Sequence, residues 1–332
     1  MAPEQQLAAP HPSRERLACI GAGLVGSAWA IVFARAGFAV SLYDSSAVVL
    51  ASAPQRIREQ LDALHANGLL DEPAEAVAAR VCIADSLAQA LQDVAYVQES
   101  ILERAELKRA LLQEIEALDD GRLIVGSSTS GIPASAFASG LKIAARVLVV
   151  HPVNPPSLIP LVELVPSPDT SSAALAFARQ LMQACRQSPI TVNREIDGFV
   201  LNRLQAVLLR EAWSLVKDGI ASTEDVDKTV RDGLGWRWSF MGPFETIDLN
   251  AVGGVADYAR RLGPLYQRIA ASRDHGDAWD EAWIDQVEAQ RRERLAHGEL
   301  PTRAHWRDLR LMAFARHLRE VGGSEDVQNA SA

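Results

Sequence analysis

Three glycines, Gly21, Gly23 and Gly26, lie within one apolar run, LACIGAGLVGSAWA, at residues 17–30. Glycine weakens strands and helices, so three of them here indicate conformations or close contacts that only glycine permits. The spacing Gly-x-Gly-x-x-Gly between a strand and a helix allows a tight turn, close approach of the backbone to a pyrophosphate, and close packing of helix on strand. The N-terminus of that helix would offer unpaired N–H groups to the phosphates.

The chain from residue 17 to about residue 196 alternates short apolar runs with longer stretches of helical spacing. This alternation predicts a Rossmann-type α/β domain, with a mostly parallel sheet covered by helices. The runs expected to be strands are 17–20, 39–44, 81–85, 95–100, 123–128 and 146–151.

The second of these strands ends in Asp44, 18 residues after Gly26. A carboxylate at this point can accept hydrogen bonds from the adenosine ribose, and its charge opposes a 2′-phosphate. The arrangement therefore predicts an NAD site and disfavours NADP. FAD uses the same fingerprint, and a glycine-rich turn beside an ordinary surface aspartate is the structural alternative.

Composition excludes several other classes of protein. The 332 residues carry a formal net charge of −9, which argues against a nucleic acid or an anionic membrane as partner. Cys19, Cys82 and Cys185 have no C-x-x-C spacing, so we expect neither a disulfide framework nor a metal site, and a reducing cytoplasm is the expected compartment. Residues 1–16 are polar and Pro-rich and are expected to be a disordered leader.

The pattern changes after residue 196. Residues 199–217 follow a 3.6-residue period, and no clear strand follows, so 197–320 is expected to be an all-helical domain and 321–332 a frayed tail. Many apolar helix positions suggest that this domain forms a homodimer, although they could instead fill its own core; examples are Trp213, Leu215, Phe240, Phe244 and Leu265.

Polar side chains end two of the buried strands. Ser130 follows the run 123–128, and His151 ends the run 146–151, so both are expected at the carboxyl edge of the sheet, where ligands bind in open α/β sheets. A histidine there can take the hydroxyl proton when an alcohol loses hydride to a nicotinamide. Glu163 in the apolar run LVELV would accept the other imidazole N–H, and Asn202, a poor helix former, would donate to the substrate oxygen.

Each of these residues also has a structural interpretation. His151 could only end a strand, Ser130 could only cap a helix, Glu163 could mark an edge, and Asn202 could make an interdomain hydrogen bond. Taken together within a dinucleotide-binding domain, they favour catalysis.

The motifs STSGI, HPVNPP and GFVLNRL, together with the glycine turn, resemble the short-chain L-3-hydroxyacyl-CoA dehydrogenase family from about residue 17 to residue 265. The resemblance implies a catalytic pair of His151 and Glu163, with Ser130 and Asn202 at the substrate oxygen. It also implies an NAD-binding domain followed by a helical domain that dimerises. The cofactor contacts that it implies are Leu24 and Val25 at the phosphate turn, Asp44 at the ribose, and Glu103 and Lys108 toward the nicotinamide; a solvated helix face is the alternative for that last pair.

Within this family the motifs are most similar to the branch that oxidises L-gulonate, which makes a small L-3-hydroxy acid the expected substrate. Arg237 is expected to pair with its carboxylate. Trp236 and Trp238 could pack on the guanidinium or form a cage for a quaternary ammonium, which would make L-carnitine the substrate. The motifs also leave open a 3-hydroxyacyl-CoA substrate such as 3-hydroxybutyryl-CoA, and a non-catalytic NAD-binding role. Ser157 departs from the branch, where an aromatic residue is expected.

Overall fold

A computed structural model describes residues 10–11, 15–273 and 281–329. Two compact units divide the chain: Met1–Arg203 together with Ala304–Ala332, and Leu204–Arg303. Most of the expected leader lies outside the described residues. Of the expected tail, residues 321–329 belong to the last helix and residues 330–332 lie outside the described part.

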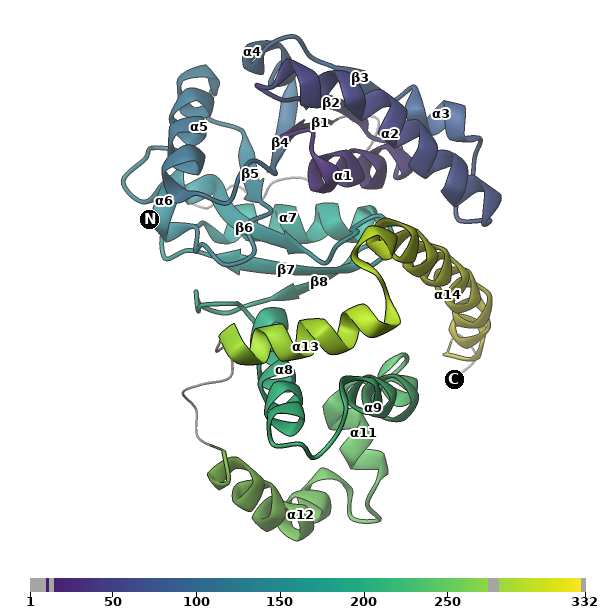
Figure 1. Ribbon diagram of the computed structural model, residues 1–332. Helices are drawn as coiled ribbons and strands as arrows, with labels where there is room; N and C mark the ends of the chain where they lie inside the picture. The colour runs from purple at the N-terminus through teal and green to yellow at the C-terminus, as the bar shows by residue number, and fades with distance from the viewer. Residues whose placement is uncertain (1–9, 12–14, 274–280, 330–332) are drawn as a thin grey trace. The chain divides into compact units, whose positions relative to one another are not determined.

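The first unit is built on one sheet of eight strands in the order β3-β2-β1-β4-β5-β6-β7-β8 (Figure 1). Neighbouring strands run parallel except for β6 and β7, which are antiparallel. All six predicted strands are present, and β7 and β8 extend the sheet. The strands are β1 (Arg16–Ile20), β2 (Ala39–Tyr43), β3 (Val81–Ile83), β4 (Val94–Glu99), β5 (Ile124–Ser127), β6 (Val147–Pro152), β7 (Leu161–Pro166) and β8 (Ser188–Thr191).

Helices cover both faces of this sheet, as expected for an α/β domain. Those of the first unit are α1 (Leu24–Arg35), α2 (Ala47–Ala66), α3 (Ala74–Ala78), α4 (Leu87–Ala90), α5 (Ala105–Leu118), α6 (Ser135–Ala138), the 3₁₀ turn Ala144–Arg146 and α7 (Ser172–Ala184).

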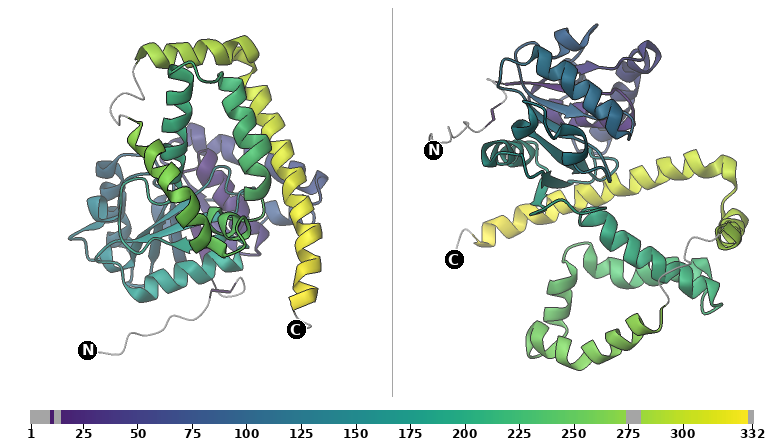
Figure 2. Two further views of the ribbon diagram at one scale, coloured as in Figure 1. Left: turned by 90° about the horizontal axis from the view of Figure 1, so that it is seen from below. Right: turned by 90° about the vertical axis from the view of Figure 1, so that its left-hand side faces the viewer.

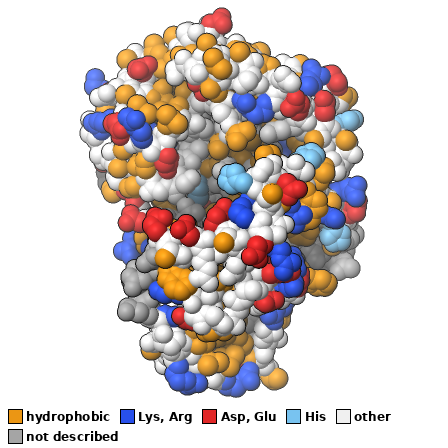
Figure 3. Space-filling model, in the orientation of Figure 1, with side chains coloured by type: hydrophobic (Ala, Val, Ile, Leu, Met, Phe, Trp, Pro, Cys, Tyr) orange, Lys and Arg blue, Asp and Glu red, His pale blue; other side chains and the backbone are white. Residues whose placement is uncertain are grey.

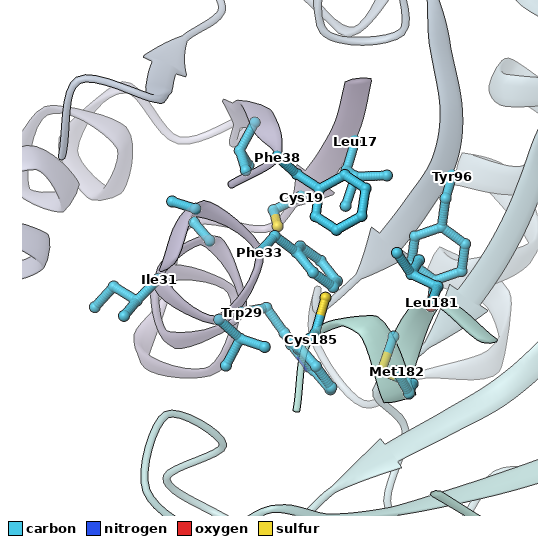
Figure 4. Packing of buried hydrophobic residues seen from close by; sticks show 14 of the residues in the cluster. Leu17, Cys19, Trp29, Ile31, Phe33, Phe38, Tyr96, Leu181, Met182 and Cys185 are labelled. Atoms are coloured by element: carbon cyan, nitrogen blue, oxygen red, sulfur yellow. The ribbon is translucent and has the colours of Figure 1, made fainter. Parts of the chain in front are cut away.

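Alternate residues of the strands feed two separate cores. In β1, Leu17 and Cys19 join the cluster under α1, α2 and α7, whereas Ala18 and Ile20 join the cluster under α5 and α6. Figure 4 shows the first cluster, in which Phe33 of α1 lies among aromatic and sulfur-containing side chains. Its ring stacks on Trp29 with centroids 5.4 Å apart and meets Tyr96 edge-on at 6.1 Å. The period-2 burial of the central strands fixes their register.

The described part of the second unit consists of helices (Figure 2). The helices from residue 201 onward are α8 (Leu201–Lys217), α9 (Thr223–Lys228), the π-helical turn Thr229–Leu234, α10 (Gly235–Trp238), α11 (Pro243–Leu249), α12 (Gly254–Ala271), α13 (Glu281–Arg294), the 3₁₀ turn His297–Glu299 and α14 (Leu300–Asn329). Among the described residues 204–303, only Val216 and Thr246 are buried, each with 5% exposure. Figure 3 shows hydrophobic side chains at the surface over these helices.

Most of helix α14 belongs to the first unit, although the sequence placed it in the helical domain 197–320. Its residues from Ala304 onward group with the first unit, where Met312 is 7% exposed and joins the core cluster under α1 and α2. Sequence periodicity cannot reveal which surface an apolar helix face meets, so this assignment needed the structure. In the described part of the chain, every helix is too short or too polar to cross a bilayer.

Candidate active site

The glycine turn connects β1 to α1, and each glycine meets a different demand. Gly21 has φ +98°, a conformation that side chains rarely adopt, and a Cβ there would lie 2.5 Å from the carbonyl oxygen of Ser100. At Gly26 a Cβ would overlap the carbonyl oxygen of Gly21, so this glycine lets α1 pack on the turn. A Cβ on Gly23 would meet no atom within 4 Å. The open space beside Gly23 is what a bound pyrophosphate requires.

Asp44, immediately after β2, holds the glycine turn through its backbone. Its Oδ2 accepts a hydrogen bond from the N–H of Ala22 at 2.8 Å, and its Oδ1 accepts one from the N–H of Ser46 at 2.8 Å. Leu24, 72% exposed, and Val25 open α1 at the free helix N-terminus, which presents N–H groups and the positive end of the helix dipole. These residues fit a dinucleotide with an unphosphorylated ribose.

Arg56 is a contributor to this turn that sequence analysis missed. From α2 it donates to the carbonyl oxygen of Ala22 at 2.5 Å and to Oγ of Ser27, which is fully buried. Oγ of Ser27 itself donates to the same carbonyl at 3.0 Å. The peptide of Ala22 is therefore held on its N–H by Asp44 and on its oxygen by Arg56 and Ser27. A single arginine on an amphipathic helix gives no sequence signal for such a role.

His151 and Glu163 meet as directly opposed residues of the antiparallel strands β6 and β7. Nδ1 of His151 lies 2.8 Å from Oε2 of Glu163, and the two residues are 4% and 0% exposed. The ring of Phe199 packs on the imidazole with centroids 5.6 Å apart. No described residue makes a hydrogen bond to Nε2 of His151. The expected contact is present, with one imidazole nitrogen engaged and the other available.

The second oxygen of Glu163 caps the start of α8. Its Oε1 accepts hydrogen bonds from the N–H groups of Val200 and Leu201 at 2.8 and 3.0 Å. Gly198 and Phe199 have φ of +72° and +50°, and this left-handed turn directs those N–H groups toward β7. Burial raises the pKa of Glu163, but the hydrogen bonds from His151, Leu201 and Val200 outweigh it, so the net shift is downward. The carboxyl group is therefore ionised at neutral pH and can only accept hydrogen bonds.

Ser130 and Asn202, 72 residues apart in the sequence, contact each other. Nδ2 of Asn202, in the first turn of α8, donates to the carbonyl oxygen of Ser130 at 2.8 Å. Oγ of Ser130 makes no hydrogen bond with the described residues. Glu103 holds the same loop, because its Oε1 accepts from Thr129 Oγ1 at 2.6 Å and from the N–H of Ser130 at 2.8 Å.

Lys108 is buried in the first turns of α5, so the alternative of a solvated helix face is wrong for it. It is 1% exposed, and its Nζ lies 2.8 and 3.0 Å from the two oxygens of Glu99. Oγ of Ser127 donates to the same carboxylate, and Oε2 of Glu103 lies 3.5 Å from Nζ. This buried ion pair anchors the end of β4. Contacts of Glu103 and Lys108 with the cofactor stay predictions.

Arg237 lies in α10 of the second unit. It is exposed, and its Nη1 reaches Oδ1 of Asn250 only at 3.5 Å; the flanking Trp236 and Trp238 are 73% and 41% exposed. A cage for a cation would also need a carboxylate nearby; Asp248 lies in the next helix, α11, and its Oδ1 already accepts from the N–H of Val255 at 2.7 Å. The role of Arg237 toward a substrate stays a prediction.

Comparisons with protein families match both parts of the chain. A family model described as "3-hydroxyacyl-CoA dehydrogenase, NAD binding domain" matches residues 16–196, and one described as "3-hydroxyacyl-CoA dehydrogenase, C-terminal domain" matches residues 198–291. The first match contains the glycine turn, the strand β6 with His151 and the strand β7 with Glu163. The second begins with the turn that feeds α8.

Individual relatives cover most of the chain. Lambda-crystallin from Oryctolagus cuniculus is 38% identical over 314 residues, covering 93% of this chain and 98% of the relative. L-carnitine dehydrogenase from Streptomyces coelicolor is 37% identical over 274 residues, covering 80% of this chain and 84% of the relative. Among solved structures, (S)-3-hydroxybutyryl-CoA dehydrogenase from Ralstonia eutropha is similar with a TM-score of 0.63 at 28% identity, covering 77% of this chain and 88% of that chain.

The glycine turn allows a test that separates packing from ligand binding. Gly26→Ala places a methyl group against the backbone oxygen of Gly21, so we expect a loss of about 1–3 kcal/mol in the free energy of unfolding. Gly23→Ala places its methyl group in open space and should cost less than about 1 kcal/mol. It should nevertheless raise the Kd for NAD by about tenfold or more, the effect of about 1.4 kcal/mol. Urea unfolding and NAD titration of both variants check this; NAD binding by Gly23→Ala with wild-type affinity would contradict the assignment.

Proposed function

The chain belongs to the 3-hydroxyacyl-CoA dehydrogenase family, and from that premise we propose that it is an NAD-dependent dehydrogenase of a small L-3-hydroxy acid, with L-gulonate as the first candidate substrate. The observation that carries the proposal is the 2.8 Å contact between Nδ1 of His151 and Oε2 of Glu163 in a buried site. This arrangement is what proton removal from an alcohol requires.

His151 acts as the base, because Glu163 fixes its tautomer. The ionised carboxylate can only accept, so Nδ1 must carry a proton and donate it, which leaves the lone pair on Nε2. Nε2 then takes the proton of the substrate hydroxyl, and the negative charge of Glu163 stabilises the imidazolium that forms. The N-terminus of α8 keeps Glu163 from taking that proton itself, because two N–H groups stabilise its charge.

Ser130 and Asn202 hold the oxygen that loses the proton. Oγ of Ser130 makes no hydrogen bond with the described residues and is therefore available to a ligand. Asn202 positions the loop that carries Ser130 by donating to the carbonyl oxygen of Ser130. NAD, when bound, supplies the acceptor for the hydride. Gly23, Leu24 and Val25 would face its phosphates, Gly21 and Gly26 would allow the turn that brings them there, and Asp44 would hold its ribose.

Two substitutions test the base and its tautomer. His151→Ala should lower kcat by about 100-fold or more and leave the Kd for NAD unchanged. Glu163→Gln keeps an oxygen for Val200 and Leu201, so its amide NH₂ must face Nδ1 and donate to it, which moves the imidazole proton to Nε2. We expect a comparable loss in kcat with little change in the melting temperature. NADH formation under saturating substrate measures kcat for both variants; NAD titration and thermal unfolding measure the Kd and the melting temperature.

Glu99 provides the comparison for these variants. Glu99→Gln breaks a buried ion pair outside the proposed base, so it should lower stability more than it lowers turnover per folded enzyme. Wild-type turnover by Glu163→Gln would sink the tautomer mechanism. An absence of turnover of every 3-hydroxy acid by wild-type protein that binds NAD would favour a non-catalytic NAD-binding role, which is the alternative to the proposal.

The substrate proposal depends on how a carboxylate is recognised. The relatives include an L-carnitine dehydrogenase at 37% identity, close to the 38% of lambda-crystallin, so carnitine is the second candidate. Both gulonate and carnitine are 3-hydroxy acids with a free carboxylate, but carnitine carries a quaternary ammonium where gulonate carries further hydroxyl groups. Arg237 is our proposed partner for the carboxylate, and Trp236 and Trp238 are the side chains that could receive the ammonium.

A panel of four substrates separates these possibilities. We expect kcat/KM for L-gulonate to exceed that for L-carnitine, L-3-hydroxybutyrate and 3-hydroxybutyryl-CoA. Arg237→Leu should lower kcat/KM for the free acids mainly through KM, by about 2–5 kcal/mol of transition-state binding, because one partner of a charge pair is removed. Arg231→Leu, which removes a neighbouring exposed arginine already paired with Asp232, is the matched control. Preference for the thioester would refute the role of Arg237.

We also propose that the second unit forms a homodimer. Its described residues include almost no buried core, and several large apolar side chains are exposed by more than two thirds: Trp236 at 73%, Phe240 at 70%, Phe244 at 78% and Leu249 at 68%. Phe240 and Phe244 therefore do not fill the unit's own core, which was the alternative for them, whereas Trp213 and Leu215 are partly buried and Leu265 is 41% exposed. An apolar surface of this extent indicates a protein partner, and a second copy is the commonest one.

Sedimentation at micromolar concentration tests the dimer. We expect the mass of two chains for wild-type protein and of one chain after the paired substitution Phe244→Arg and Leu249→Arg, because two charges would be buried at the interface. Val48→Arg provides the control, since Val48 is 80% exposed on α2 of the first unit and should leave the dimer intact. A monomeric mass for wild-type protein would refute the proposal.

A further inference from the structure

A cavity of about 650 Å³ lies within the first unit, where the end of α1, the connection from α2 to α3, the loop before β7, the end of α7 and helix α14 meet. This volume is in the range of sites for small organic ligands. Its walls are mainly aliphatic and aromatic, formed by Leu69, Leu158, Leu311, Phe314 and Leu318. Small side chains, among them Ser157 and Ala315, leave the space open.

Three arginines but only two carboxylates line this cavity, so positive charge is in excess. Asp71 pairs with Arg186 at 2.6 Å and lies 3.6 Å from Arg319, so one carboxylate serves two rim arginines. Glu72 is occupied by Arg80, with Nη1 2.5 Å from its carboxylate. Arg35 forms no ion pair with any described residue.

Arg35 has only neutral hydrogen-bond partners. Its Nη1 donates to the carbonyl oxygen of Ser157 at 2.7 Å, and the amide oxygen of Gln187, in the orientation that suits its neighbours, lies 3.3 Å from Nη2. The pKa of Arg35 is lowered to about 10, chiefly by burial and then by the positive charges of Arg319 and Arg186, and the negative charge of Asp71 offsets only part of this shift. The nearby thiol of Cys185 stays protonated, because burial raises its pKa to about 12, so it supplies no compensating charge.

A partly buried guanidinium with no carboxylate of its own to pair with is unfavourable, and a ligand that brings one negative charge would relieve that cost. We propose that this cavity binds a medium-chain fatty carboxylate, with the carboxylate at Arg35 and the alkyl chain along Leu311, Phe314 and Leu318 of α14. One negative charge matches the single unpaired arginine, and an unbranched chain matches the apolar walls.

This site is distinct from the proposed active site. Its lining includes neither a residue of the glycine turn nor His151, Glu163, Ser130 or Asn202. The proposal therefore does not rest on the proposed dehydrogenase function, and its test measures binding alone.

Isothermal titration of the full-length protein with decanoate, and with 1-decanol as its uncharged counterpart, tests the proposal. Wild-type protein should bind one decanoate per chain. Arg35→Gln keeps a donor for the carbonyl of Ser157 but removes the charge, so it should weaken decanoate by about 10- to 100-fold and leave 1-decanol nearly unchanged. Arg186→Gln, at an exposed arginine already paired with Asp71, is the matched control and should weaken decanoate less than about fivefold.

Ala315→Trp fills the cavity from α14 and should abolish binding of both ligands without weakening NAD. Absence of decanoate binding, equal affinity in Arg35→Gln and wild type, or competition between decanoate and NAD would each overturn the site. If decanoate binds only after the dimer dissociates, the cavity is filled by a second copy of the chain and the proposal is wrong.

Discussion

The carboxylate of Glu163 is the constraint on which the proposed active site depends. A buried charge costs several kcal/mol unless each oxygen is paired, and here one oxygen meets His151 while the other meets the first N–H groups of α8. The two oxygens of this carboxylate therefore join the two antiparallel strands, fix the orientation of the imidazole, and determine where the helix that carries Asn202 begins. Because β6 and β7 oppose His151 to Glu163 in register, a slip of β7 by one residue would turn Glu163 to the other face of the sheet, away from His151, and lose all three functions.

Local patterns were sufficient for the parts of the fold whose partners are near in sequence. The six expected strands alternate with helices, and each is long enough for its apolar run to stand out, as in β1 and β6. β8 was not predicted because its four residues, SPIT, include a proline and only one large apolar side chain. β7 was not among the predicted strands, because Glu163 interrupts its apolar run. His151, 12 residues away, was the expected partner of that glutamate, but the N–H groups of Val200 and Leu201, 37 and 38 residues away, also make it acceptable in a buried strand, and no sequence spacing reveals them.

The same distinction applies to the site. The glycine spacing and Asp44 follow from a βαβ unit whose geometry is largely local, so their positions could be predicted. Arg56 acts on a backbone carbonyl and a serine hydroxyl from another helix, and Lys108 is buried because Glu99 on a neighbouring strand meets its charge. Both read in sequence as ordinary charged positions on amphipathic helices. Arg35 is the opposite case, since what distinguishes it is a missing counter-charge, which only the set of its neighbours can show.

The residues proposed for catalysis and those proposed for substrate recognition lie in different parts of the chain, so the type of reaction is easier to infer than the substrate. The proposed base and its partner stand on adjacent strands of the sheet, where register and burial allow little variation. Arg237 and the tryptophans beside it stand in the exposed α10, which packing constrains far less. Relatives named for carnitine and for 3-hydroxybutyryl-CoA are consistent with the proposal, because one scaffold accommodates different substrates when the side chains proposed to recognise them lie outside the sheet. A change of substrate would therefore be expected to begin at α10, and a loss of catalysis at the contact between β6 and β7.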